Sequence, residues 1–424
     1  MFYICSNCGY GSASWMGKCP SCGAWQSFVE KKEDRVKKIK IEELKIISLD
    51  HLPKIEKNRK KTGVFEIDRV LGGGIVEGET ILLTGEPGVG KSTLLLQGLN
   101  HLRCLYVLGE ESATQVVSRA KRLNVSLKNF LFTETTQIEG IINGLKELKE
   151  KIDLLVVDSI QTIYSEKIDT PIGNISQIKE VISQLITFAK KNNIPIIIVG
   201  HITKEGEIAG PKTLEHLVDC VLIFEGEKES NFRFLRTSKN RFGPTDEVGI
   251  FEMKEEGLVA VTNPLAFLEK KEEEACKAIV GVGEGKRVLF FEIQTLVVPT
   301  ILAVPRRIVK GLDYNKVLLL LAVAQKHLYI PLDKFDLYVN VVGGVNIKST
   351  AADLGFIASL LSSIKNHSLP QNTLFCGEVG LLGEVRKTFF EEKVIKEGKR
   401  LGFTTIYSSK TLKNIKKLKE IFNF

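Results

Sequence analysis

A glycine-rich loop between two regular segments constrains the fold of this chain more than any other feature. The run Thr80–Thr84 holds only aliphatic and β-branched residues, which predicts a buried strand, and Lys91–His101 predicts a helix. Between them the chain reads Gly85-Glu86-Pro87-Gly88-Val89-Gly90-Lys91-Ser92. Glycines let backbone N–H groups turn inward, and the start of a helix favours an anion. A strand, this loop and a helix in succession predict a cradle for the phosphates of a nucleotide.

The residue types in the loop indicate both a nucleotide and a metal. A lysine at the end of such a loop reaches the β- and γ-phosphates, and the hydroxyl after it ligates Mg²⁺. These residues are Lys91 and Ser92, so we expect ATP and Mg²⁺ as cofactors. The residues expected to contact the nucleotide are Gly85, Glu86, Pro87, Gly88, Val89, Gly90, Lys91, Ser92 and Thr93.

Acidic residues at two further strand ends complete a hydrolytic site. The run Leu154–Val157 ends in Asp158, which we expect to hold the magnesium water shell; a strand-terminal aspartate that caps the next element is the alternative. The strand after the loop helix ends in Glu110 and Glu111. An acid there faces the crevice in which doubly wound sheets bind ligands. We predict Glu110 as the base for the attacking water, with Glu111 as the alternative.

Apolar runs alternate with helical stretches from Gly63 to Pro264, which predicts a doubly wound α/β fold. Their near-continuous Val, Ile and Leu content suits a mostly parallel sheet that is covered on both faces. The expected strands are Thr80–Thr84, Leu105–Leu108, Leu154–Asp158, Ile194–Gly200 and Val218–Phe224. After a polar helical stretch, Leu268–Lys277, a second α/β region includes an expected helix at Tyr314–His327 and a strand at Asp336–Val342.

Four cysteines near the start of the chain have the spacing of a zinc ligand set. Cys5 and Cys8 form one CxxC pair, and Cys19 and Cys22 form a second. Each pair can present two thiolates from a tight turn, and Zn²⁺ takes four such ligands in a tetrahedron. Disulfides or a redox CxxC motif are the alternatives, which a cytosolic location and the presence of two paired motifs disfavour. The other cysteines lie in apolar surroundings and are expected to be inert core residues: Cys104, Cys220, Cys276 and Cys376.

Charge and hydropathy patterning bear on partners and location. A net charge of +8 and a pI near 8.9 weakly favour polyanionic partners. The longest apolar run, Val317–Ala324, is far shorter than the roughly 20 residues of a spanning helix, and the N-terminus lacks a signal-peptide pattern. We expect a cytoplasmic protein without membrane contact.

Several motifs together resemble the RadA (Sms) family of bacterial recombination proteins. They are Asp68-Arg69-Val70-Leu71-Gly72-Gly73-Gly74, the stretch Gly200–Pro211, and Lys239-Asn240-Arg241-Phe242-Gly243. With the zinc module, the resemblance covers essentially the whole chain, and the KNRFG pentapeptide is its most specific part. It implies a RecA-type ATPase core, and RecA-like ATPases place their catalytic glutamate at the position of Glu110.

The KNRFG segment also resembles a region of DnaB helicases that reaches the ATP of a neighbouring subunit. Lys239 and Arg241 would then act in trans and stabilise charge on the transferring phosphoryl group. From the residues alone, a solvated basic turn ahead of Gly243-Pro244 is the alternative.

The candidate DNA-binding loop, Thr203–Lys212, carries two lysines, and a histidine lies just before it. Lys204 and Lys212 would contact phosphates of single-stranded DNA without reading its sequence. His201, at the end of an expected strand, could sense the γ-phosphate, although a lone histidine is usually structural.

Residues 275–424 resemble the Lon protease domain through three short landmarks. These are Val341–Gly344, Gly377–Gly380 and Gly383–Val385. Aligning the two places Ala351 where Lon has its serine, and Glu392 near the place of the catalytic lysine. A Ser–Lys dyad needs both groups, so the resemblance implies a scaffold without protease activity.

These observations divide the chain into a zinc module at residues 1–28, a basic linker at 29–61, a RecA-like ATPase domain at 62–265 and an inactive Lon protease-like domain at 275–424. The resemblance implies a DNA-dependent ATPase, a helicase or translocase that processes recombination intermediates on single-stranded DNA in recombination and repair. It also implies a RecA-type recombinase as partner and a homo-oligomer, expected to be a hexameric ring. The alternative is an ATP-gated RecA-fold scaffold or autokinase without helicase activity.

Overall fold

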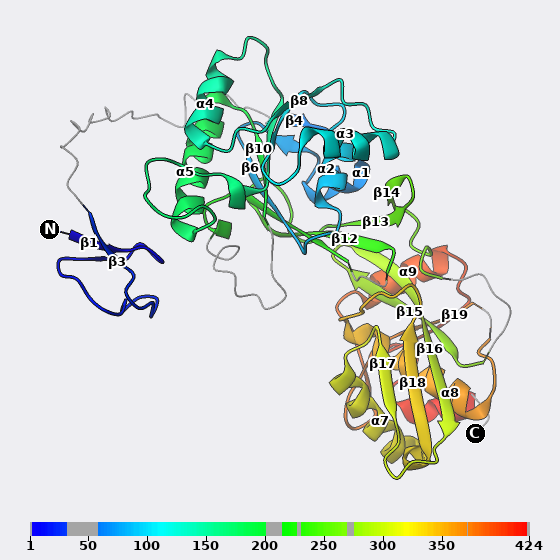
Figure 1. Cartoon of the computed structure of the whole chain (residues 1–424). Helices are drawn as coiled ribbons and strands as arrows, with labels where there is room; N and C mark the ends of the chain where they lie inside the picture. Colours follow the sequence, from blue (N-terminus) through cyan, green and yellow to red (C-terminus); the bar gives the residue numbers. More distant parts are fainter. Residues whose placement is uncertain are drawn as a thin grey trace, which may run out of the picture. The chain divides into compact units, whose positions relative to one another are not determined.

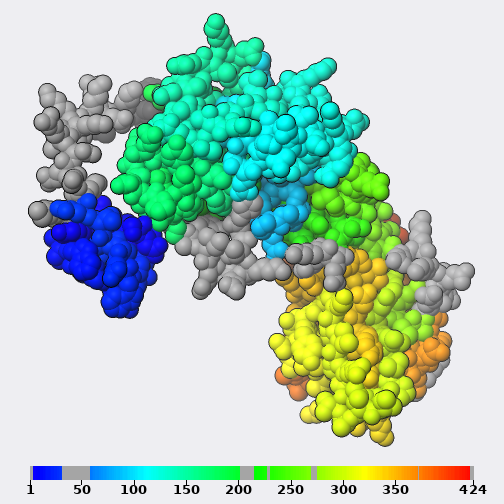
Figure 2. Space-filling model, in the orientation of Figure 1, coloured from blue at the N-terminus to red at the C-terminus, as the bar shows by residue number. Residues whose placement is uncertain are grey.

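The computed structural model describes residues 2–31, 58–200, 214–226, 230–268, 275–370 and 372–421 (Figure 1). The chain divides into two compact units. The first comprises Met1–Phe224, Arg236–Thr245 and Glu255–Gly257; the second comprises Glu225–Leu235, Asp246–Lys254 and Leu258–Phe424. In the space-filling view the colours run from blue to green through most of the first unit and from green to red through the second (Figure 2).

A nine-stranded sheet with the order β14-β13-β12-β11-β6-β10-β9-β7-β8 carries the nucleotide-loop motif. Every strand pair from β11 to β8 is parallel. The central strands are buried because their side chains are almost all Val, Ile or Leu. Their bounds are β6 (Thr80–Thr84), β7 (Cys104–Leu108), β8 (Phe130–Thr133), β9 (Leu154–Asp158), β10 (Ile196–Val199) and β11 (Cys220–Glu225). The remaining three are β12 (Phe232–Asn240), β13 (Val248–Lys254) and β14 (Gly257–Ala260).

Helices lie on both sides of the parallel part of this sheet (Figure 1). On one side are α4 (Ile138–Glu147) and α5 (Ile175–Asn192), whose apolar residues share a core with β9 and β10. On the other are α1 (Phe65–Val70), α2 (Lys91–Gly98) and α3 (Ala113–Arg122). The expected doubly wound, mostly parallel fold is therefore confirmed.

A small antiparallel sheet of order β2-β1-β3 forms the N-terminal module. It comprises β1 (Phe2–Cys5), β2 (Gly11–Ser12) and β3 (Phe28–Lys31). Its buried apolar cluster consists of Cys5, Cys19 and Phe28. So small a core supplies little stability by itself, and modules of this size usually need a metal.

The second unit contains a six-stranded sheet of order β17-β18-β16-β15-β19-β22. Helix α8 (Asp353–Lys365) is buried along most of its length and shares one apolar core with α7 (Tyr314–Leu328) and the central strands. The strands are β15 (Lys277–Glu284), β16 (Arg287–Pro299), β17 (Arg307–Lys310), β18 (Phe335–Val341), β19 (Thr373–Cys376) and β22 (Thr405–Ser408). The shorter elements are β20 (Glu378–Val379), β21 (Val385–Arg386), α9 (Glu391–Arg400) and α10 (Leu418–Ile421).

Two local expectations need correction in this unit. The polar stretch Leu268–Lys277 was expected to be helical to its end, but Lys277 is the first residue of strand β15. Residues 269–274 lie outside the described part of the chain. Cys276 is only half-buried and has a φ of 72°, whereas Cys104, Cys220 and Cys376 are buried as expected. Within the described residues, no helix is both long enough and apolar enough to cross a membrane.

Candidate active site and metal centre

The loop between β6 and α2 has the backbone that its glycines predict. Gly85, Gly88 and Gly90 have φ values of 157°, 79° and 110°. A Cβ on Gly85 would lie 2.3 Å from the carbonyl oxygen of Phe224, so no larger residue fits there. Gly90 is the left-handed residue directly before α2, which leaves the N–H groups of the first helical turn open to an anion.

The ammonium group of Lys91 lies inside this loop. Its Nζ donates hydrogen bonds to the carbonyl oxygens of Gly85 at 2.9 Å and Glu86 at 3.1 Å. Burial lowers the pKa of Lys91, while the negative charges of Asp158 and Glu110 act to raise it. Two acidic groups are therefore close enough to Lys91 to influence its charge, which brings the three predicted site residues together.

Asp158, at the end of β9, is held by two hydroxyl groups. Ser92 Oγ donates to Asp158 Oδ2 at 2.8 Å. Tyr106, in β7, donates its phenolic hydroxyl to the same oxygen at 2.6 Å. The contact with Ser92 brings together the two residues that are expected to bind magnesium. This arrangement suits a site in which the hydroxyl ligates Mg²⁺ and the carboxylate holds the water shell of the ion. The alternative of Asp158 as a helix cap is not favoured, because the next element begins with Ser159 as its N-cap. Sequence reasoning missed Tyr106.

The two adjacent glutamates after β7 have different partners. Glu110 accepts a hydrogen bond from the hydroxyl of Ser159, the residue that follows Asp158. Glu111 instead forms an ion pair with Arg119 of α3 at 2.5 Å. Glu110 thus lies beside the phosphate loop and Asp158, whereas Glu111 is tied to the helix that follows. The geometry favours Glu110 over Glu111 as the residue for the attacking water.

Gly109 allows the ends of β7 and β9 to approach each other. A Cβ there would lie 2.0 Å from Thr162 Oγ1 and 3.1 Å from the backbone N and O of Ser159. Thr162 closes the short 3-10 helix η2 (Ile160–Thr162) by donating to Ser159 O at 2.9 Å. This close approach places Glu110 within reach of Ser159.

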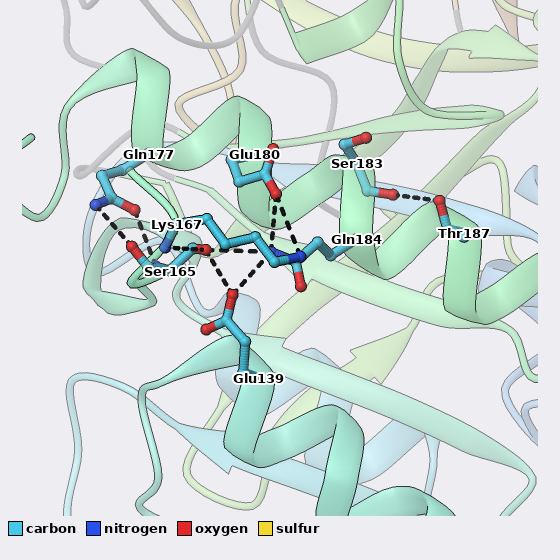
Figure 3. A network of polar contacts seen from close by, with 8 residues as sticks. All are labelled: Glu139, Ser165, Lys167, Gln177, Glu180, Ser183, Gln184 and Thr187. Carbon is cyan, nitrogen blue, oxygen red and sulfur yellow. Dashed lines mark hydrogen bonds and ion pairs between the residues drawn. The ribbon is translucent and has the colours of Figure 1, made fainter. Parts of the chain in front are cut away.

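A polar network fixes the segment that follows η2 onto α4 and α5 (Figure 3). Gln177, on α5, accepts from Ser165 N at 2.9 Å and donates to the carbonyls of Ser165, Ile168 and Thr170 at 2.8–3.1 Å. Glu139, on α4, accepts from Ser165 Oγ at 2.6 Å and from Gln184 at 3.0 Å. A single buried glutamine thereby satisfies the backbone of a loop that has no regular structure.

The KNRFG segment, which spans the end of β12 and the turn that follows it, packs against the glycine turn after α1. Arg59 donates through Nη1 to Leu71 O at 3.0 Å and Gly74 O at 3.1 Å, and through Nη2 to Phe242 O. Arg59 itself lies in β4 (Arg59–Lys60), which pairs with β5 (Ile75–Val76). A Cβ on Gly243 would lie 3.0 Å from Leu71 O. The two motifs of the family resemblance are therefore one packed structure.

The two basic residues of this turn differ in their surroundings. Lys239 Nζ donates to the carbonyls of Glu215 at 2.7 Å and Val218 at 2.8 Å, and burial lowers its pKa, as does the charge of Arg241. Arg241 Nη1 forms an ion pair with Asp219 Oδ1 at 3.4 Å, and the Arg241 side chain is 53% exposed. Lys239 thus ties the end of β12 to residues 215–218 of the same chain, while the guanidinium of Arg241 remains accessible. The predicted residues His201, Lys204 and Lys212 lie outside the described residues.

The four N-terminal cysteines converge on one point. Their Sγ atoms all lie within 4.8 Å of one another, with 3.7 Å between Cys5 and Cys22 and 3.6 Å between Cys8 and Cys19. A tetrahedron of sulfurs bound to Zn²⁺ at about 2.3 Å has edges of about 3.8 Å. Gly9 and Gly23 close the two knuckles with left-handed φ values of 77° and 74°. The thiols therefore fit one zinc ion.

The position that resembles Lon's nucleophile carries no reactive group. Ala351 is buried in the short helix η4 (Thr350–Ala352). The neighbouring Ser349 uses its hydroxyl to accept from Ala351 N. Glu392, aligned near the catalytic lysine, is exposed and paired with Lys387 at 3.0 Å.

These features define a class of protein: a RecA-like P-loop ATPase with a zinc ribbon, which uses ATP, Mg²⁺ and Zn²⁺. The features are a phosphate loop, a strand-end aspartate held by the serine of that loop, a glutamate beside them, and a centre of four thiols. Residues 60–151 match the KaiC ATPase family, and residues 3–30 match a rubredoxin metal binding domain. The ATP, Mg²⁺ and Zn²⁺ expected from the sequence are thus confirmed as its cofactors.

Full-length relatives narrow the class to a family. The chain is 43% identical to the DNA repair protein RadA of Aquifex aeolicus, over 97% of this chain and 93% of the relative. It is 44% identical to the RadA proteins of Rickettsia bellii (96% and 93%) and Streptococcus pyogenes serotype M1 (96% and 92%). The chain belongs to the RadA family of DNA repair proteins, which confirms the resemblance drawn from its motifs and supports a role in DNA repair and recombination.

Two solved structures are similar over about half of the chain. One is the RadB recombinase, with 26% identity and a TM-score of 0.39, covering 47% of this chain and 98% of that one. The other is a KaiC-like protein from Pyrococcus horikoshii, with 20% identity and a TM-score of 0.41, covering 48% and 99%.

Proposed function

We propose that this protein is a ring-forming, DNA-dependent ATPase that moves along single-stranded DNA and processes recombination intermediates. The observation that carries the proposal is the placement of Glu110 beside Asp158 and the phosphate loop, combined with an accessible Arg241 on a turn that Arg59 holds through Phe242 O. The first group of residues forms most of a hydrolytic site. An exposed arginine on a fixed turn can complete the site of a neighbouring copy.

Each residue has a defined task in this proposal. Bound Mg²⁺ supplies charge neutralisation for the β- and γ-phosphates. Lys91 binds the phosphates from within the loop, and Ser92 with Asp158 holds the metal site. Glu110 orients the attacking water and accepts its proton, with its carboxylate held in place by Ser159. The remaining charge on the transferring group is stabilised in trans by Arg241.

The contacts of Lys239 change its part in the proposal. Its ammonium is engaged by backbone carbonyls of its own subunit, so we assign it to holding the turn and leave the trans role to Arg241. Lys204 and Lys212 stay as proposed DNA phosphate contacts, and a recombinase of the RecA type stays as a proposed partner.

The C-terminal domain is proposed to be a scaffold for ring assembly without proteolytic activity. Ala351 offers only a methyl group where a nucleophile would be needed. Casein incubated with pure protein and ATP should remain intact. Degradation that disappears after changing one serine or lysine of residues 275–424 would contradict this assignment.

The motor is distinguished from a scaffold or autokinase by its response to DNA. Single-stranded DNA should raise ATP turnover, and the wild-type protein should displace a strand from a forked substrate only with hydrolysable ATP. Lys91→Ala serves as the matched inactive control. ATP turnover that is indifferent to DNA, together with no strand displacement, would favour the scaffold.

A further inference from the structure

Tyr106 has a hydroxyl group that core packing does not explain. The residue lies in the middle of β7 and is 2% exposed. Its ring packs against Phe130 and Phe132, with centroids 6.4 and 6.0 Å away. A phenylalanine would fill the same space among these rings. A buried hydroxyl carries a desolvation cost unless it is hydrogen-bonded, so its partner indicates its purpose.

That partner is the carboxylate of Asp158. The Tyr106 hydroxyl lies 2.6 Å from Oδ2, the same oxygen that accepts from Ser92 at 2.8 Å. A phenol hydroxyl that faces a carboxylate oxygen is the donor of the hydrogen bond, because an ionised carboxylate has no proton to donate. Among the described residues, no side chain donates to Oδ1 of Asp158, which leaves that oxygen for the metal site.

We propose that Tyr106 is a positioning residue that fixes the rotation of the Asp158 carboxylate and so sets the affinity of the magnesium site. Two donors on one oxygen hold a carboxylate in one orientation, whereas a single donor leaves it free to turn. Ser92 supplies one of these donors and Tyr106 supplies the second. Groups that orient metal-site carboxylates typically change metal affinity about 10-fold or more when removed. This inference rests on the proposed role of Asp158 in the metal site.

The test is a metal titration of the full-length protein bound to ADP, with Mn²⁺ as the probe and free Mn²⁺ measured by electron paramagnetic resonance. Tyr106→Phe keeps the ring and removes the hydroxyl. Its matched control is Tyr164→Phe, since Tyr164 is a half-buried tyrosine whose hydroxyl is not hydrogen-bonded to Asp158. We expect the Mn²⁺ affinity of Tyr106→Phe to fall about tenfold, and that of Tyr164→Phe to stay within twofold of wild type. High Mg²⁺ should restore ATP turnover in Tyr106→Phe.

Further measurements distinguish a failure of the role of Tyr106 from a failure of the metal-site role of Asp158. ADP binding in EDTA should be unchanged in Tyr106→Phe; a parallel loss of ADP affinity would show a general structural role and overturn the inference. An Mn²⁺ affinity within twofold of wild type would also overturn it. Asp158→Asn should weaken Mn²⁺ binding strongly. If Asp158→Asn binds Mn²⁺ normally, the metal-site assignment itself fails, and the role of Tyr106 fails with it.

Discussion

The hydroxyl of Ser159 donates a hydrogen bond to the carboxylate of Glu110, although the two residues are 49 positions apart in the chain. The contact joins the ends of two neighbouring parallel strands, β7 and β9. The contact places the carboxylate of Glu110 against Ser159, the residue that follows Asp158. Both groups therefore lie at the edge of the sheet where doubly wound folds bind their ligands. Glu111, the next residue in the chain, is drawn away from this edge by Arg119.

This difference predicts opposite outcomes for two conservative changes. Glu110→Gln should bind ATP normally and lose hydrolysis by about 10²-fold or more, because the amide cannot accept the proton of the attacking water. Glu111→Gln should stay within a few-fold of wild-type turnover. Steady-state ATPase rates and fluorescent nucleotide binding measure both. Normal ATP hydrolysis by Glu110→Gln, together with no hydrolysis by Glu111→Gln, would show that Glu111 is the base and not Glu110.

The zinc centre gives a prediction that concerns metal content alone. Protein purified without chelator should carry one equivalent of zinc, since the four thiols are spaced as one tetrahedral site. Cys8→Ser should lower the zinc content, whereas Cys276→Ser, a half-buried cysteine outside the module, should not. Elemental analysis decides the matter. Less than half an equivalent, or a disulfide between Cys5 and Cys8, would refute the site.

The sequence predicted the elements of the ATPase core because their signals are local. Apolar runs and a glycine loop define β6, β9 and α2 within a residue or a few of their observed bounds. The four zinc ligands could also be predicted from the sequence, because the CxxC spacing lets two thiolates of one tight turn bind the same metal ion.

The contacts that refine the site could not be predicted in the same way. Tyr106 donates a hydrogen bond to Asp158, which lies 52 positions away in the chain. Ser159 donates to Glu110, 49 positions away, and Arg59 donates to Phe242, 183 positions away. Such pairings depend on strand order and register, which apolar periodicity leaves open. A tyrosine within an otherwise aliphatic strand was the only available signal for Tyr106.

Gln177 offers a test of the network beyond Asp158. Gln177→Leu keeps the side-chain volume but leaves Ser165 N and three carbonyls without their partner. An unsatisfied buried group costs about 1–3 kcal/mol, so the thermal midpoint should fall by several degrees. Thr187→Ala, at an exposed hydroxyl of the same helix, is the control and should change it little. An unchanged midpoint for Gln177→Leu would show that the network contributes nothing to stability.

The two basic residues of the KNRFG turn should separate in stability measurements. Lys239→Met keeps the aliphatic stem but removes the donor for Glu215 O and Val218 O, and should cost about 1–2 kcal/mol. Arg241→Ala should change stability by no more than about 0.5 kcal/mol, because its side chain is mostly exposed. Thermal or denaturant unfolding compares them. Equal losses would contradict the division of roles between the two residues.

Assembly into a ring with shared ATP sites is the central claim, and mixing two inactive variants tests it most directly. Arg241→Ala retains the phosphate loop and Glu110 but lacks the trans arginine, whose loss typically costs about 10³-fold or more in rate. Lys91→Ala lacks the loop lysine but retains Arg241. If neighbouring subunits share a site, some sites in a mixed ring join an intact loop to an intact arginine. ATP turnover across mixing ratios should then rise above that of either variant alone and peak at intermediate ratios. No gain at any ratio, with co-assembly of the two variants shown by differential labelling, would contradict the account and confine Arg241 to its own subunit.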